Sequence, residues 1–147
     1  MKKIMILCLL TLATIILLGC SAKPPTTEVV QVFKSATCSC CATYIAELKN
    51  QGYQVTETNT ADMTAIKKKY NIPSFLESCH TAVIGKYVIE GHVSFKAVKK
   101  LLEEQPDIDG IALPGMPQGS PGMPGPKQQP FKIYAIKNGN PSEFMVI

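Results

Sequence analysis

The sequence predicts an α/β domain in which short strands and helices alternate along the chain. Runs of β-branched and apolar residues, each of strand length, alternate with segments that carry apolar residues at helical spacing. Together they predict the order β-α-β-α-β-β-α between residues 29 and 104. Beyond this point the chain becomes rich in proline and glycine and then shows the pattern of a β-hairpin.

The first three elements are predicted from residue type and spacing. Residues 29–33 are apolar and largely β-branched, which indicates a buried strand. Residues 42–50 predict a helix, because Ile45 and Leu48 fall on one face. The alternating segment 53–58 predicts the second strand.

The next three elements are a helix and a pair of strands. Residues 62–70 predict a helix that is capped by Asp62 and ended by Pro73. The strands 81–84 and 87–90 then flank a tight turn that contains a glycine. This pattern predicts an antiparallel pair.

The third helix is predicted to begin after its cap at Ser94 and to bury an apolar stripe. Charged residues outside the expected core are interpreted as solvated surface, both the lysine run 67–69 and Glu90.

The tail of the domain changes in character. Residues 106–130 are rich in proline and glycine and predict loops without a regular element. The pair Asn138-Gly139 predicts the turn of a terminal hairpin built from 131–136 and 144–147. We therefore expect one domain over residues 29–147.

Residues 1–19 predict a signal peptide that is removed on export. A positive start precedes an apolar run that is too short for a comfortable membrane-spanning helix of roughly 20 residues. The run closes on Leu17-Leu18-Gly19-Cys20, which resembles the bacterial lipobox, where the chain is cut before the cysteine and that cysteine is acylated. We expect lipidation at Cys20 and a tether over 20–28. The alternative is an ordinary signal peptide with an incidental cysteine.

Acylation with several chains holds a protein stably to a membrane, whereas a single chain is marginal. We therefore expect an exported, lipid-anchored protein on the periplasmic side of the outer membrane or at the cell surface. By resemblance to sorted lipoproteins, Ser21 favours the outer membrane in a host that has one.

The basic residues are all lysine, with 15 of them against 11 acidic residues and a net charge of +4. Proteins that read nucleic acid rely on arginine for bidentate contacts to guanine and phosphate. The lack of arginine argues against a nucleic-acid partner.

Six cysteines are present, but Cys8 leaves with the signal peptide and Cys20 is the expected lipid anchor. An exported protein with four remaining cysteines is ordinarily interpreted as having two disulfides. Here three of the four crowd into four residues, and a bridge between adjacent cysteines would be strained. The spacing instead favours a metal site built from Cys38, Cys40, Cys41 and Cys79.

The element order is similar to that of the thioredoxin and glutaredoxin folds. In those folds the segment after the first strand carries the reactive thiols, and the loop before the third strand lies against them. Here these segments read Cys38-Ser39-Cys40-Cys41 and Ser78-Cys79-His80-Thr81. Thioredoxins carry a cis-proline in the second loop, and no proline stands immediately before Thr81. This departure argues against an oxidoreductase that binds extended substrate chains.

The cysteine set favours copper, bound as several Cu(I) ions. Thiolates suit Cu(I), zinc and iron–sulfur centres, and assembly of the last is generally intracellular. The adjacent Cys40 and Cys41 are awkward ligands for one tetrahedral Zn²⁺, whereas they can bridge neighbouring ions. One Zn²⁺ would neutralise only half of the charge of four thiolates, while several Cu⁺ ions neutralise more. Zinc remains the alternative metal.

Two histidines and two methionines are further candidates as ligands or as groups that support the ligands. His80 adjoins Cys79, and His92 follows the fourth strand in a turn expected to face the thiols. Met116 and Met123 lie in two Gly-Met-Pro units that could wrap the domain and present thioethers. Alternatively, the histidines fill polar loop positions and the methionines simply pack.

Five segments resemble the CopG-type copper-resistance family of small exported metal-binding proteins, often encoded beside copper-efflux systems. They are Val32–Cys41, Ser78–Val83, Tyr87–Val93, Leu113–Pro117 and Gly119–Met123. The resemblance implies a thioredoxin-like fold, copper binding by the four cysteines and a periplasmic role in copper handling. Envelope efflux or carrier proteins are then the expected partners. Many relatives look soluble, so the lipobox is a departure.

Three functions are consistent with these residues. The first is an envelope protein that sequesters, transfers or redox-cycles Cu(I). The second is a thiol–disulfide oxidoreductase that uses Cys38 and Cys41, with Cys79 as the resolving thiol and Cys40 dispensable. The third is a structural lipoprotein with two disulfides and no metal.

Overall fold

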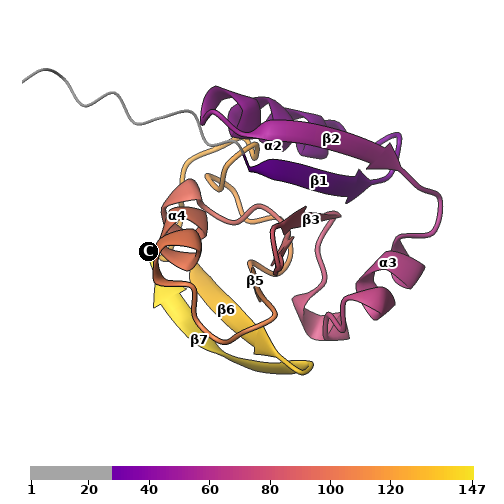
Figure 1. Cartoon of the computed structure of the whole chain (residues 1–147). Coiled ribbons are helices and arrows are strands. Elements are labelled where there is room, and N and C mark those ends of the chain that lie inside the picture. Colours follow the sequence, from indigo (N-terminus) through magenta and orange to yellow (C-terminus); the bar gives the residue numbers. More distant parts are fainter. Residues whose placement is uncertain (1–27) are drawn as a thin grey trace, which may run out of the picture.

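The computed structural model describes residues 28–147, which form a mixed α/β fold around one seven-stranded sheet in the order β2-β1-β3-β4-β5-β6-β7. The expected signal peptide, the lipobox and Cys20 lie outside the described residues. Three α-helices and one short 3-10 helix accompany the sheet in the described part of the chain (Figure 1). Within residues 28–147, no helix has the length and apolar character needed to cross a membrane.

The chain enters the sheet through a parallel pair of strands joined by a helix. Strand β1 (Val29–Lys34) pairs with β2 (Gln54–Asn59) in parallel. Helix α2 (Ser39–Asn50) connects them and begins three residues earlier than the apolar spacing predicts. Its first turn therefore contains cysteines, which no apolar periodicity marks.

Helix α3 (Met63–Lys69) has the predicted cap, because an Asp62 carboxylate oxygen accepts a hydrogen bond from the Ala65 N–H at 2.9 Å. Pro73 does not directly end α3; it precedes the 3-10 helix η1 (Ser74–Leu76). Strands β3 (His80–Ile84) and β4 (Tyr87–Glu90) form the predicted antiparallel pair.

Helix α4 (Phe95–Glu104) begins at the predicted cap, since Ser94 Oγ accepts from the Ala97 N–H. The predicted terminal hairpin is also present, as β6 (Lys132–Lys137) and β7 (Asn140–Val146). The expectation that residues 106–130 hold no regular element is wrong. Strand β5 (Gly110–Ala112) pairs parallel with β4 and antiparallel with β6, so it joins the hairpin to the sheet.

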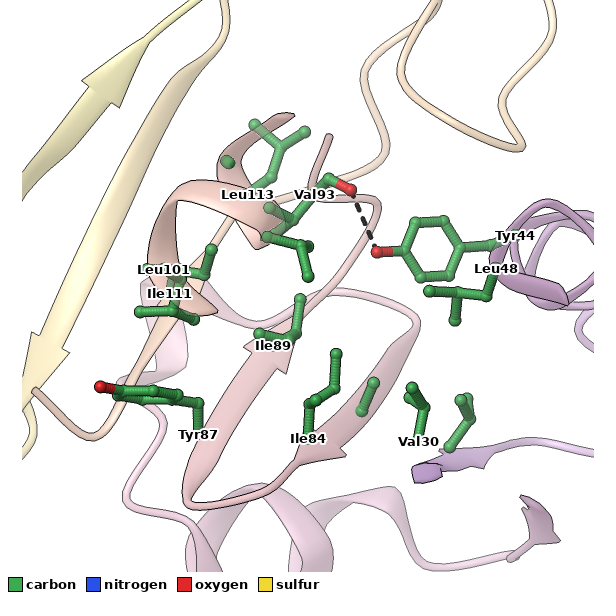
Figure 2. Packing of buried hydrophobic residues seen from close by; sticks show 14 of the residues in the cluster. Val30, Tyr44, Leu48, Ile84, Tyr87, Ile89, Val93, Leu101, Ile111 and Leu113 are labelled. Atoms are coloured by element: carbon green, nitrogen blue, oxygen red, sulfur yellow. Dashed lines mark hydrogen bonds between the residues drawn. The ribbon is translucent and has the colours of Figure 1, made fainter. Parts of the chain in front are cut away.

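The sheet is covered on both faces. Tyr44 and Leu48 of α2 share one apolar cluster with Leu101 of α4, and Figure 2 shows this packing together with the hydrogen bond from the Tyr44 hydroxyl to the Val93 carbonyl. A second, smaller cluster lies on the opposite face and contains Ile72, Leu76, Val88, Ala112 and Ile136. Successive strand residues alternate between these clusters, as expected for a sheet buried on both sides.

Candidate metal centre

Strand pairing brings four loops to one end of the sheet. Lys34, the last residue of β1, pairs with His80, the first residue of β3. Glu90, the last residue of β4, pairs with Thr81 of β3 and with Ala112, the last residue of β5. The loops that follow β1, β4 and β5 therefore meet the loop that precedes β3. Cys38, Cys79, His92 and both candidate methionines lie in these loops, while Cys40 and Cys41 begin α2 and His80 begins β3.

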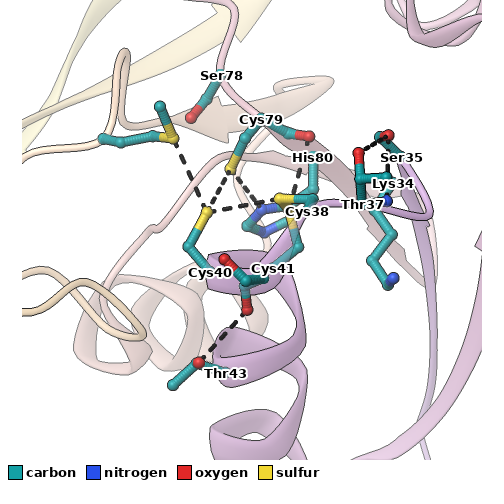
Figure 3. Close-up of a disulfide and its surroundings, with 12 residues drawn as sticks. Lys34, Ser35, Thr37, Cys38, Cys40, Cys41, Thr43, Ser78, Cys79 and His80 are labelled. Carbon is teal, nitrogen blue, oxygen red and sulfur yellow. Dashed lines mark hydrogen bonds between the residues drawn. A yellow bond between two sulfur atoms is a disulfide. The ribbon is translucent and has the colours of Figure 1, made fainter.

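The four candidate cysteines gather at this end of the sheet (Figure 3). Their sulfur atoms lie within 4.8 Å of one another. Cys38 and Cys41 form a disulfide, while Cys40 and Cys79 are free and about half-buried. Because only one disulfide forms among the described residues, the interpretation as a structural protein with two disulfides is not supported.

The start of α2 explains how three cysteines reach the site together. Cys38 is the N-cap residue, and Cys40 and Cys41 lie in the first turn of α2. No side chain caps this helix end, so its first N–H groups and the positive end of the helix dipole face the sulfur atoms.

Cys79 approaches the helix from the neighbouring loop. Its sulfur lies 3.9 Å from the Cys40 sulfur, which itself lies 3.5 Å from the Cys38 sulfur. Burial, together with the nearby Cys40, raises the pKa of the Cys79 thiol to about 12. Without metal this cysteine is therefore protonated at neutral pH, and binding a metal cation must displace the proton.

His92 points its ring at Cys79. Its Nδ1 lies 2.7 Å from the Pro121 carbonyl oxygen, and only a protonated nitrogen can donate to that oxygen. The lone pair of the neutral ring is therefore on Nε2, 3.0 Å from the Cys79 sulfur. Burial lowers the pKa of His92, which further favours this neutral form.

His80 is completely buried and packs against aromatic rings. Its ring centroid lies 4.6 Å from that of Tyr44 and 4.9 Å from that of His92. Its Nδ1 is 3.4 Å from the Cys79 sulfur, while Nε2 has no hydrogen-bond partner among the described residues. Burial lowers the pKa of His80 to about 3, so the ring is neutral.

The two methionines of the Gly-Met-Pro units differ in position. The Met116 sulfur lies 3.9 Å from the Cys40 sulfur, and the side chain is half exposed. Met123 instead lines a groove of about 840 Å³, which Cys40 also borders. The structure thus places the Met116 thioether against the thiols and places Met123 in the neighbouring groove.

The proline-rich segment is held against α2, which brings the Pro121 carbonyl to His92. Gly122 donates its N–H to a Glu47 carboxylate oxygen at 2.9 Å. A Cβ at Gly122 would lie 2.7 Å from the Tyr44 backbone nitrogen, and φ is +76°, so only glycine fits this close approach.

A buried ion pair, which the sequence interpretation missed, holds the Cys79 loop. Glu90 is fully buried and accepts hydrogen bonds from Lys67, from the Ser78 N–H at 2.6 Å and from the Thr81 hydroxyl at 2.6 Å. Burial raises the pKa of Glu90, while these donors oppose the rise. The expectation that Lys67 and Glu90 are solvated is wrong. The sequence did offer one signal of this burial, because Glu90 is an acidic residue at the end of an otherwise apolar strand.

The spacing of the free donors fits a metal ion. Two sulfur ligands at about 2.3 Å from one ion lie about 3.8 Å apart in a tetrahedral site. The separations Cys40–Cys79 and Cys40–Met116 are both 3.9 Å. A second set, Cys79, His80 and His92, also has its donor atoms within 4.8 Å. The two sets share Cys79, and their thiolate, imidazole and thioether donors suit soft metals.

Comparisons with solved structures then place the chain. Two structures described as copper resistance protein CopG, form 1 and form 2, each share 36% sequence identity with it. Each has a TM-score of 0.76 and aligns with 82% of this chain and 98% of its own chain. The chain belongs to the CopG family.

Part of the chain also matches a described protein family. Residues 76–123, which contain Cys79, both histidines and both methionines, match the family described as "Protein of unknown function, DUF411". A search of the curated proteins found no match to this chain.

Proposed function

We propose that this protein binds copper at the cell envelope and sequesters, transfers or redox-cycles Cu(I) through Cys38, Cys40, Cys41 and Cys79. The observation that carries the proposal is the gathering of these four sulfur atoms within 4.8 Å at a helix N-terminus. Membership of the CopG family, in which the two solved relatives are named for copper resistance, supports copper as the metal.

The donor chemistry supports several Cu(I) ions in the reduced protein. Four thiolates carry four negative charges, and thiolate sulfur can bridge neighbouring soft cations. The adjacent Cys40 and Cys41 are suited to such bridging, because they are poor joint ligands for one tetrahedral ion. Each bound ion displaces the proton of a thiol, so binding weakens as the pH falls.

The disulfide supports a redox role within the same proposal. When the thiolates of Cys38 and Cys41 join, they release two electrons, and two Cu²⁺ ions that accept them become two Cu⁺ ions. Cys40 and Cys79 stay reduced and remain beside the new disulfide. The chain thus has the groups needed to couple copper reduction to disulfide formation.

Metal content per chain tests the proposal. The full-length protein is prepared with C8S and C20S, so that only the four domain cysteines contribute thiols. After reduction and anaerobic loading with Cu(I), we expect more than one copper per chain and a clear loss in C40S or C79S. Retention of no copper by the reduced four-cysteine protein would disprove the proposed function.

A thiol–disulfide oxidoreductase is the second candidate, because Cys38 and Cys41 are paired at the start of a helix with Cys79 nearby. The lack of a proline immediately before Thr81 weighs against it. The C40S variant separates the candidates. Copper binding requires Cys40, whereas reduction of insulin by the Cys38–Cys41 pair would continue without it.

We also propose a lipid anchor at Cys20 and an envelope location, with copper-efflux or copper-carrier proteins as partners. The Leu-Leu-Gly-Cys motif at residues 17–20 supports this proposal. Growth with labelled fatty acid, followed by cell fractionation, should show label and membrane association that C20S loses.

The element order of β1 to α4 further supports a thioredoxin-like relationship.

A further inference from the structure

The disulfide removes two thiolates from the four-cysteine set but leaves a second donor set in place. Cys40 and Cys79 stay free, and His92 and Met116 contact them from two other loops. The oxidised chain thus presents two thiols, one imidazole nitrogen and one thioether at one end of the sheet.

We propose that the protein keeps one copper ion, as Cu(I), after Cys38 and Cys41 have paired, on a site formed by Cys40, Cys79 and His92 with Met116 at its exposed side. This inference rests on the proposed copper function and assigns a separate site to the oxidised state. The reduced protein holds several ions on four thiolates, and disulfide formation lowers its capacity to one.

The distances support one ion in this place. The Cys40 sulfur is 3.9 Å from both the Cys79 and the Met116 sulfur, close to the roughly 3.8 Å between two sulfur ligands of one tetrahedral ion. A nitrogen and a sulfur on one ion lie about 3.5 Å apart. The observed 3.0 Å between His92 Nε2 and the Cys79 sulfur must therefore open by about half an ångström.

The orientation of His92 is the strongest argument. Metal-bound histidines usually donate the other ring N–H to a carbonyl or carboxylate, which sets the ring orientation and the tautomer. His92 has this arrangement, because its Nδ1 donates to the Pro121 carbonyl at 2.7 Å. The carbonyl belongs to the proline-rich segment that the Gly122–Glu47 hydrogen bond holds against α2.

The turn that carries His92 is equally constrained. Gly91 has φ of +77°, and a Cβ there would lie 2.6 Å from the Leu113 carbonyl oxygen and from the Ser78 side chain. The backbone before His92 therefore packs directly against the loops of Met116 and Cys79. A thiol S–H that donates to Nε2 would explain the short contact in the absence of metal, and the following experiment distinguishes the two explanations.

Replacing Cys38 and Cys41 by serine reproduces the loss of their thiolates without an oxidant. In the full-length C8S/C20S protein carrying C38S/C41S, we expect one Cu(I) per chain after anaerobic loading. Adding H92Q should weaken Cu(I) binding about 100-fold in competition with a Cu(I) chelator. The loss of a direct ligand lowers metal affinity at least as much as the loss of a group that supports a ligand. In the four-cysteine protein, H92Q should leave more than one copper bound.

The two Gly-Met-Pro units provide a matched control. In the C38S/C41S protein, M116L should weaken Cu(I) binding about tenfold, while M123L should change it by less than about twofold. Both substitutions keep the size and apolar character of the side chain, so this comparison holds even where H92Q disturbs folding. Thermal unfolding of each metal-free variant checks the fold.

The outcomes separate this inference from the proposed function. The oxidised-state site would be overturned if the C38S/C41S protein lost all copper. It would also be overturned if M116L and M123L bound Cu(I) equally and H92Q left binding unchanged. Several copper ions on the reduced four-cysteine protein would leave the proposed function standing in that case. The C8S/C20S protein with its Cys38–Cys41 disulfide formed should also bind one copper per chain. A count of two free thiols verifies that the disulfide has formed.

Discussion

At the residue scale, His80 is the most unusual group of the site. It is enclosed by the rings of Tyr44 and His92, and no solvent reaches it. Its Nε2 has no partner among residues 28–147, although buried polar groups are usually hydrogen-bonded. An uncharged ring tolerates this environment, whereas a protonated ring would place an unpaired charge in it.

The burial of His80 predicts that the metal-free protein loses stability in acid. The folded-state pKa is about 3, while an exposed histidine titrates near 6.5. Between these values the unfolded chain binds the extra proton, so the free energy of unfolding falls as the pH falls below about 6.5. From pH 8 to pH 5 the contribution is on the order of 2 kcal/mol. H80Q should remove this part of the pH slope in urea unfolding, and an identical slope in both proteins would contradict the prediction.

At the element scale, the Lys67–Glu90 pair joins α3 to the end of β4 and to the loop that carries Cys79. Glu90 binds the backbone on one side of Cys79, at Ser78, and the side chain of Thr81 on the other. The loop that positions Cys79 is therefore held by an ion pair that is almost completely buried. Breaking a buried pair is costly, because one charge remains without a partner.

We expect E90Q to lower the free energy of unfolding by about 3–5 kcal/mol, because it leaves the Lys67 ammonium buried and unpaired. The K67M/E90Q protein should lose less than E90Q alone, since no buried charge remains. Urea unfolding of the reduced, metal-free proteins provides the measurement.

The exposed pair Lys49–Glu57 supplies the control for this prediction. Both of its side chains are substantially exposed, and such pairs contribute little. E57Q should change the free energy of unfolding by less than about 1 kcal/mol. Equal effects of E57Q and E90Q would show that the buried pair does not stabilise the loop.

At the scale of the whole molecule, the proposed metal centre joins segments that are distant in sequence. Cys40 and Cys79 are 39 residues apart, and Cys40 and Met116 are 76 apart. The unfolded chain does not hold these donors together. A metal that binds the folded chain preferentially therefore stabilises it in proportion to the logarithm of free metal concentration.

Copper loading should consequently raise the stability of the reduced C8S/C20S protein. At free Cu(I) about a thousandfold above the dissociation constant, the gain is about 4 kcal/mol for one site. Anaerobic thermal unfolding should show this gain, and a strong Cu(I) chelator should reverse it. C79S should gain much less. A gain of equal size in C79S would mean that copper does not use the gathered site.

The predictions from sequence succeeded where local patterns determine the structure. Side-chain caps mark where α3 and α4 begin, and Asn138-Gly139 marks the terminal turn. Neither a capping side chain nor apolar spacing marks the first turn of α2, because residues Ser39 to Cys41 are polar or sulfur-containing. It also missed β5, because a three-residue strand within a proline-rich segment is stabilised by its two neighbours in the sheet.

Local spacing and element order in the sequence predicted most of the elements, the cysteine cluster after the first strand and the position of Cys79 against it. The folded structure was needed to show that Cys38 pairs with Cys41 and that Met116 rather than Met123 contacts the thiols. It was also needed to show that a carbonyl 29 residues away orients His92. It also decided that Lys67 and Glu90 are buried. Burial and ligand direction depend on which distant strands pair and which loops they bring to one end of the sheet, and a local sequence pattern does not specify those pairings.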